Sequence, residues 1–170
     1  HGQWDTGGEA WVYDMQSGVL TTIPRPAGVL AASAEDVNDL GLVAITASIQ
    51  GGAFRAFAYV VSRGNWWRLP PLPGGTWSMA SAVNNNGQVC GWRGLISPGQ
   101  VPQSAFIWSQ ADGFQDSGLI EGESTHAVDI TEAGAVTGGM RVGGVSHPFV
   151  WTPPELVDLG SYKRYETSAA

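Results

Sequence analysis

The chain has 170 residues, 43% of them hydrophobic and 14% charged, and its 15 acidic and 8 basic side chains give a formal net charge of −7. The length suits one domain of ordinary size, and no apolar run is long enough to cross a bilayer, so we expect no membrane insertion. The acidic balance leaves no basic stripe to neutralise phosphates, which disfavours binding to nucleic acid.

The first predicted element is a strand with an aromatic signature that returns along the chain. Each copy holds a small residue, an aromatic, an apolar residue and a second aromatic, and the copies are 46, 49 and 43 positions apart. Because side chains alternate along a strand, the two rings of a copy share one face, and we expect all eight rings to fill the space between stacked sheets. The copies are Ala10-Trp11-Val12-Tyr13, Ala56-Phe57-Ala58-Tyr59, Ala105-Phe106-Ile107-Trp108 and Pro148-Phe149-Val150-Trp151.

A second signature keeps the same period and predicts a tight hairpin loop. Each loop opens with Asn or Thr, whose short side chain bonds the nearby backbone, so we expect these residues to form turns rather than to bind ligands. Each loop closes with a glycine, which can take the positive φ that a short hairpin needs. The pairs of opener and glycine are Asn38 and Gly41, Asn84 and Gly87, and Thr131 and Gly134.

Small residues accompany these loops. Ala34, Ala80 and Ala127 lie four positions before the three loop openers and predict places where a neighbouring backbone or ring packs closely. The single cysteine, Cys90, precludes an intrachain disulfide and lies in a predicted strand, where we expect a small buried hydrophobe.

Together the signatures predict about four short strands in each unit of about 45 residues. Tandem units of this kind predict an all-β chain of four-stranded antiparallel repeats, arranged as about three and a half to four blades of a β-propeller, with a β-solenoid as the alternative. We expect one repeat domain over residues 1–170, with units at about 9–54, 55–103 and 104–146 and a partial unit at 147–170. The partial unit predicts further repeats or self-association of chains to complete a ring.

Tryptophans outside the repeat are the candidate ligand-binding residues. Trp66, Trp77 and Trp92 stand where other units have no aromatic residue, and Trp4 precedes the first unit. An indole can stack on a sugar ring or hold a partner's side chain, so we expect a carbohydrate ligand first and a protein ligand second. The alternative is a small local core in which Trp66, Trp67 and Trp77 cover residues 70–73, where three prolines lie.

A group of carboxylates near one histidine in the sequence supports a competing hypothesis, that the protein is an enzyme. Glu121, Glu123 and Asp129 with His126 have the residue types for general acid and base in a glycan-active hydrolase or lyase. The ordinary interpretation of these residues is a solvated loop, so the main hypothesis assigns no catalytic residue. A third hypothesis is a purely structural surface or assembly protein.

The sequence predicts no metal site and no cofactor. The segments 36–41 and 129–134 resemble calcium loops, but Leu40 and Ala133 stand where a fifth ligand is needed. Three histidines and one cysteine lack the spacing of a zinc site, and no nucleophile elbow, phosphate loop or dinucleotide fingerprint occurs.

The two signatures resemble those of the HAF family of extracellular repeats over essentially the whole chain. Units of that family read His-Ala-Phe-x-Trp, then Asp-Leu-Gly, then Ala-x-x-Ile-Asn-x-x-Gly-x-Val-x-Gly. The resemblance is carried here by His147-Pro148-Phe149-Val150-Trp151, by Asp158-Leu159-Gly160 and by the segment 80–91. The family histidine is replaced by Glu9, Arg55 and Ser104 in the other units. The resemblance implies a secreted or surface protein with a propeller-like fold and brings no catalytic residues.

Overall fold

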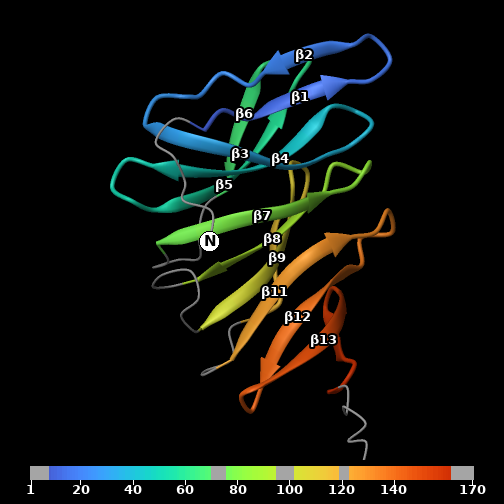
Figure 1. The fold of residues 1–170 in the computed structure, drawn as a ribbon. Coiled ribbons are helices and arrows are strands. Elements are labelled where there is room, and N and C mark those ends of the chain that lie inside the picture. Colours follow the sequence, from blue (N-terminus) through green and yellow to red (C-terminus); the bar gives the residue numbers. More distant parts are fainter. Residues whose placement is uncertain (1–7, 70–75, 95–101, 119–122, 162–170) are drawn as a thin grey trace, which may run out of the picture.

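The computed structural model describes residues 8–69, 76–94, 102–118 and 123–161, which form fourteen β-strands and no helix (Figure 1). This confirms the all-β prediction. The strands are β1 (Trp11–Asp14), β2 (Val19–Thr22), β3 (Val29–Val37), β4 (Leu42–Ile49), β5 (Phe54–Val60), β6 (Asn65–Leu69), β7 (Trp77–Val83), β8 (Val89–Gly94), β9 (Gln103–Ser109), β10 (Gly113–Asp116), β11 (Ser124–Ile130), β12 (Val136–Val142), β13 (Val145–Thr152) and β14 (Glu155–Asp158).

Consecutive strands pair antiparallel in sets. The pair β1–β2 comes first, and β3 to β6 then form a four-stranded sheet. The sets β7 to β10 and β11 to β14 repeat the same strand order, and a single parallel bridge between Gln103 and Ser124 joins them into one eight-stranded sheet. The aromatic signature lies on β1, β5, β9 and β13, and the loop signature joins the first two strands of each later set. The sets therefore share the period of the sequence repeat but begin half a unit later than the expected units.

The sets lie one above another in chain order (Figure 1), and a core cluster fills each space between them. One cluster joins the β1–β2 segment to β3, β4 and β5. The next joins β4, β5 and β6 to β7, β8 and β9, and the last joins β7, β8 and β9 to β11, β12 and β13. Each set thus buries its apolar side chains mainly against its neighbours.

The expectation that all eight signature rings are buried is wrong at the first copy, and Trp108 of the third copy is only half-buried. Phe57, Phe106 and Phe149 are buried and point toward the preceding set, as the clusters show. Trp11 and Tyr13 are 57% and 52% exposed, because they face the side of β1 on which the described residues place no preceding set.

The three loops of the second signature stack on one another. Oδ1 of Asn38 accepts hydrogen bonds from the backbone N–H groups of Leu40 and Leu42 (3.0 and 2.9 Å), which closes its own loop. Nδ2 of Asn38 donates to the carbonyl oxygen of Asn84 (2.8 Å), and Nδ2 of Asn84 donates to the carbonyl oxygen of Thr131 (2.9 Å). The asparagines form turns, as predicted, and they also hold neighbouring sets in register.

The residue after each loop opener adds a second row of bonds. The N–H of Asp39 donates to Oδ1 of Asn85 (2.9 Å), and the N–H of Asn85 donates to Oε2 of Glu132 (3.0 Å). These partners are 46 and 47 positions apart, so the period of the sequence is the spacing of real contacts. We call the two rows of bonds between the loops the loop ladder.

Each of the three four-strand sets has a β-bulge at the same place in its first strand. The register shifts at Glu35 in β3, at Ser81 in β7 and at Val128 in β11. Each bulged residue directly follows the small alanine that the sequence singles out. A bulge raises the local twist and redirects a side chain, so the three bulges give the sets a common curvature.

Two of the three bulges, those of β7 and β11, crowd a glycine on the facing strand. A Cβ at Gly138 would overlap the carbonyl oxygen of His126 and lie 3.0 Å from the ring of Phe149. A Cβ at Gly91 would lie 2.7 Å from the ring of Phe106, in the equivalent place. The signature ring therefore covers a glycine backbone, which explains why Gly91 and Gly138 stand where the family pattern ends in glycine.

His147, which directly precedes the aromatic signature on β13, pairs with an aspartate of β14, the fourth strand of its set. Nδ1 of His147 lies 2.9 and 2.8 Å from the two carboxylate oxygens of Asp158, and Oδ1 of Asp158 accepts the N–H of Gly160 (2.7 Å). These hydrogen bonds lower the pKa of Asp158, that to Gly160 most and that to His147 next. The pair ties β13 to β14.

The equivalent aspartate of the preceding set holds a buried arginine. Asp116 accepts hydrogen bonds from Oγ of Ser104 (2.9 Å) and from Arg93, whose Nη2 lies 2.7 Å from Oδ2. The guanidinium carbon of Arg93 also lies 4.5 Å from the centre of the Phe114 ring. Arg93 is buried, so its charge depends on Asp116 for compensation.

Substitution of the crowded glycine tests the packing of bulge against ring. Gly138→Ala should lower the free energy of unfolding by about 2–4 kcal/mol, because the new methyl group meets backbone that cannot move aside. The matched control is Gly139→Ala, where a Cβ meets no atom within 4 Å and the change should stay within about 1 kcal/mol. Equal urea midpoints for the two variants would contradict the crowding.

The pH dependence of stability tests the pair of His147 and Asp158. Because folding lowers the pKa of Asp158, its contribution is present above the unfolded value of about 3.9 and is lost as the pH falls through the folded value. Asp158→Asn should therefore unfold at lower urea concentration than the parent protein at about pH 7, and the two midpoints should converge by about pH 2. A difference that persists unchanged in acid would rule out the carboxylate as its source.

Candidate ligand-binding site

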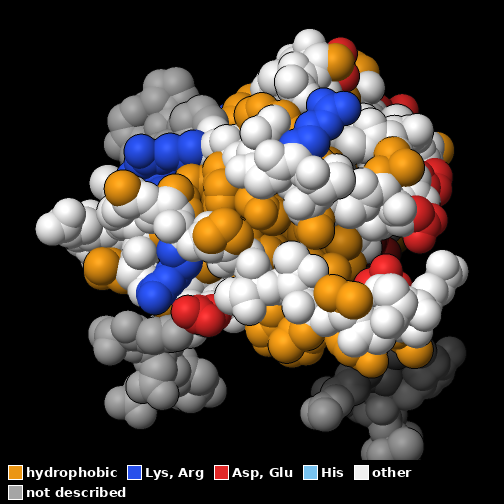
Figure 2. Space-filling model, turned by 90° about the horizontal axis from the view of Figure 1, so that it is seen from above, with side chains coloured by type: hydrophobic (Ala, Val, Ile, Leu, Met, Phe, Trp, Pro, Cys, Tyr) orange, Lys and Arg blue, Asp and Glu red, His pale blue; other side chains and the backbone are white. Residues whose placement is uncertain are grey.

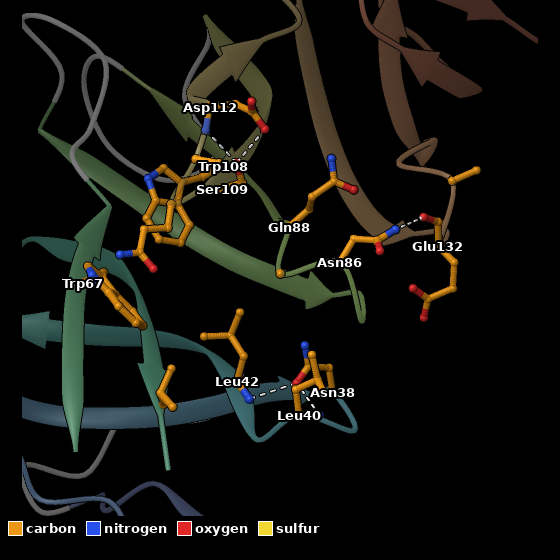
Figure 3. Close-up of a pocket in the computed structure, with 15 residues that line it drawn as sticks. Asn38, Leu40, Leu42, Trp67, Asn86, Gln88, Trp108, Ser109, Asp112 and Glu132 are labelled. Carbon is orange, nitrogen blue, oxygen red and sulfur yellow. Dashed lines mark hydrogen bonds between the residues drawn. The ribbon is translucent and has the colours of Figure 1, made fainter. Parts of the chain in front are cut away.

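A pocket of about 550 Å³ opens between the loop ladder and two tryptophans (Figure 3). Leu42, Trp67 and Trp108 form its apolar side, and Figure 3 shows Asn86 and Glu132 on the opposite side. The pocket draws residues from all three four-strand sets, so it exists only when the sets are stacked. Its volume lies within the range of small-molecule sites, about 300–1,000 Å³.

The two indoles make a bent aromatic wall. Trp67 lies on β6 opposite Ala58, and Trp108 lies on β9 opposite Val89. Their ring centres are 6.3 Å apart with a tilt of 43°. A ligand ring in van der Waals contact with both faces of a slot needs about 7 Å between the walls, so a ligand can lie along this pair but not between its rings.

The core below fixes the position of this wall. Both tryptophans are half-buried and pack against the cluster that joins the first and second four-strand sets. Phe106 and Leu69 of that cluster are fully buried. The indoles therefore keep one covered side and present the rest of their surface to the pocket.

The loop ladder sets the polar side of the pocket. Oε1 of Gln88 accepts a hydrogen bond from Nδ2 of Asn84 (2.7 Å), which orients the Gln88 amide. Gly134 of the next loop leaves room for it, because a Cβ there would lie 3.1 Å from Oε1 of Gln88. The Nδ2 of Asn86 donates to the carbonyl oxygen of Glu132. The pocket thus combines an aromatic wall with oriented amides.

Two carboxylates complete the lining. Oδ2 of Asp112 accepts from Oγ of Ser109 (2.8 Å), and the N–H of Asp112 donates back to that Oγ (2.9 Å). Glu132 uses Oε2 for the N–H of Asn85 in the loop ladder. No lysine, arginine or histidine is among the described residues that line the pocket, so its charge is negative.

The predicted ligand-binding tryptophans lie elsewhere. Trp4 falls outside the described residues. Trp66 is half-buried, with its ring centre 5.4 Å from that of Phe57 and 5.1 Å from that of Tyr59. Trp77 is 1% exposed, which leaves no ring face for a ligand to stack on.

Trp92 lies at a second, shallower hollow of about 430 Å³. Its ring centre is 4.8 Å from that of Trp77 and 4.4 Å from that of His126, so protein rings already cover much of the indole. The bulged residues Glu35 and Ser81 also line this hollow. The prolines of the alternative local core, at residues 70–73, lie outside the described residues.

Burial shifts two titrating groups in this hollow. Desolvation raises the pKa of Glu35 and lowers the pKa of His126. Nε2 of His126 lies within hydrogen-bond reach of Oε1 of Gln103, whose Nε2 is buried without a partner among the described residues. The imidazole is therefore neutral near pH 7 and is held by protein contacts.

The candidate catalytic residues are not brought together by any bond between them. Glu121 lies outside the described residues, and within the described chain no hydrogen bond or ion pair joins Glu123, His126 and Asp129 to one another. Asp129 instead accepts the N–H of Ile130 (2.8 Å). The described residues also contain no group of three or more His, Cys, Asp or Glu side chains placed to hold a metal ion.

Cys90 is fully buried, as the sequence predicts for a small hydrophobe. Burial raises the pKa of its thiol to about 12, so the thiolate is not populated near neutral pH. Cys90 therefore contributes to core packing and does not supply a nucleophile.

The sequence does not mark Trp67 and Trp108 as site residues, because both fit the pattern of core residues. Trp108 belongs to the aromatic signature, and Trp67 adjoins Trp66 in the alternative local core. The alternation of side chains along a strand was the available signal, since neighbours such as Trp66 and Trp67 must face opposite sides of the sheet. In the structure Trp66 packs against one core cluster and Trp67 packs against the next.

No protein-family model matches the sequence, and no curated protein matches it. No helix long and apolar enough to span a membrane occurs in the described part of the chain.

Proposed function

We propose that the protein is a carbohydrate-binding repeat module and that its sugar lies along Trp67 and Trp108. The observation that carries this proposal is the bent aromatic wall facing oriented amides in one pocket. A pyranose ring has an apolar face that stacks on an indole and a rim of hydroxyl groups that bond to amides and carboxylates. Two tilted indoles side by side suit two successive rings of a twisted oligosaccharide.

We propose that the stacked sets are blades of a β-propeller. Each set packs on the next through its own core cluster, and the repeated bulges and loop ladder give successive sets the same relation to one another. A β-solenoid of the same units is the alternative. In either arrangement the pocket lies where the loops of three sets meet.

We propose a secreted or cell-surface location and membership of the HAF family. The support is the resemblance of the two signatures, together with the physical role that the structure gives to their parts. His147 bonds the aspartate of the Asp-Leu-Gly element, and Gly138 makes room for a bulge and a ring.

A second candidate function, assembly with further repeats or other copies, is favoured by exposed apolar side chains at both ends of the stack. Figure 2 looks down on the β1–β2 end, where hydrophobic side chains gather in the middle of the face. Trp11 and Leu20 are among the exposed hydrophobic residues of β1 and β2, and Val145 and Val157 are among those of β13 and β14. Patches of this kind mark interaction surfaces.

Tryptophan substitutions test the binding proposal. Trp67→Ala and Trp108→Ala should each weaken binding of a glycan by about tenfold or more. The magnitude is taken from the stacking of a nucleobase on one aromatic side chain, which contributes about 1–3 kcal/mol. Trp11→Ala is the control, because Trp11 is an exposed indole that is not among the residues lining the pocket. It should leave the affinity for the glycan unchanged. The measurement is titration calorimetry against neutral and amino-sugar oligomers, with circular dichroism to verify folding. Equal affinity in all three variants would refute the site.

Self-association is tested by light scattering over a range of concentrations. If the apolar ends meet, the mass should rise with concentration, and Trp11→Glu with Leu20→Lys should return the protein to the monomer mass. A mass of one chain at every concentration would exclude assembly through copies of this chain.

A further inference from the structure

We infer that the sugar bound at Trp67 and Trp108 carries a positive charge, so that the ligand is an oligomer of an amino sugar with free ammonium groups, such as glucosamine. This inference rests on the proposed carbohydrate function and names the class of sugar that the same pocket prefers.

The charge of the pocket is the first observation. Asp112 and Glu132 line it, and none of the described lining residues is a cation. Each carboxylate has one oxygen in a hydrogen bond, to Ser109 or to Asn85, and no hydrogen bond within the described residues occupies the other oxygen. One carboxylate oxygen of Asp112 and one of Glu132 are therefore available to accept hydrogen bonds from a ligand.

The aromatic wall is the second observation, and it favours the same charge. The face of an indole attracts a cation, and tryptophan is the best side chain for this contact. Trp67 and Trp108 present two such faces in the same pocket that Asp112 and Glu132 line. Indoles with carboxylates at the rim are the combination that recognises ammonium groups.

The position of the carboxylates fits more than one charged sugar unit. In Figure 3, Asp112 lies at the end of the pocket next to Trp108, and Glu132 lies across the pocket from the tryptophans. An oligomer that carries an ammonium group on each ring can satisfy both while its rings stack on the indoles.

The competing sugar classes fit less well. A uronic acid or sulfated glycan would bring negative charge to a negative pocket on a chain of net charge −7. A neutral glycan would stack on the indoles but would cover the carboxylates without an opposite charge to compensate their lost hydration. Electrostatics therefore separates amino sugars from both.

The test compares β-1,4-linked tetramers of glucosamine, N-acetylglucosamine and glucose by titration calorimetry at low salt. The glucosamine tetramer should bind about tenfold more tightly than the other two, and its advantage should shrink as salt screens the charges. Asp112→Asn and Glu132→Gln should each weaken glucosamine binding by about threefold to tenfold and leave binding of the glucose tetramer unchanged.

Glu155→Gln is the matched control, because this exposed glutamate of β14 is not among the residues that line the pocket. Binding of all three tetramers with equal affinity, lost in Trp108→Ala but insensitive to the carboxylate variants, would overturn the inference and keep the proposed function. Binding of none of them would refute the proposed function itself. Tighter binding of a lysine-rich peptide than of any tetramer would overturn both.

Discussion

The structure depends on burial that no single sheet can achieve alone. A set of four short strands has two apolar faces, and each face is covered only by the neighbouring set. The three core clusters lie in these spaces, and the fully buried Phe106 and Phe149 point from one set into the one before it. Where the described residues place no preceding set, at β1, the equivalent rings are exposed. Trp11 and Tyr13 are thus exposed for the same reason that Phe106 and Phe149 are buried, which is whether a preceding set covers that face.

Polar contacts fix how the sets lie on one another. Apolar packing alone would allow neighbouring sheets to slide, because it has no direction. The loop ladder removes this freedom, since Asn38 and Asn84 each use one end of the amide for their own turn and the other end for the next loop. The Asn84 amide also orients Gln88 at the pocket. Structural register and the polar side of the candidate site therefore come from one row of residues.

The candidate site shows why residue type did not predict role. The sequence marks Trp77 and Trp92 as exceptional, yet Trp77 is enclosed and Trp92 is largely covered by other rings. The indoles that face the pocket include Trp108, which the repeat pattern assigns to the core. An aromatic residue on a strand belongs to the core when a neighbouring set covers its face of the sheet. It can contact a ligand when a pocket opens on that face, so its role depends on the neighbouring sets.

The sequence by itself determined the all-β class, the spacing of the repeat, the turns at Asn38, Asn84 and Thr131 and the buried character of Cys90. These are local properties, because strand alternation, a positive-φ glycine and a side chain bonded to its own loop depend on residues close in the chain. Only the tertiary structure decided where the bulges lie, which rings are covered and which carboxylates meet the indoles. Trp67, Asp112 and Glu132 belong to three different sets, and contacts between sets depend on how the sheets stack, which no local pattern encodes.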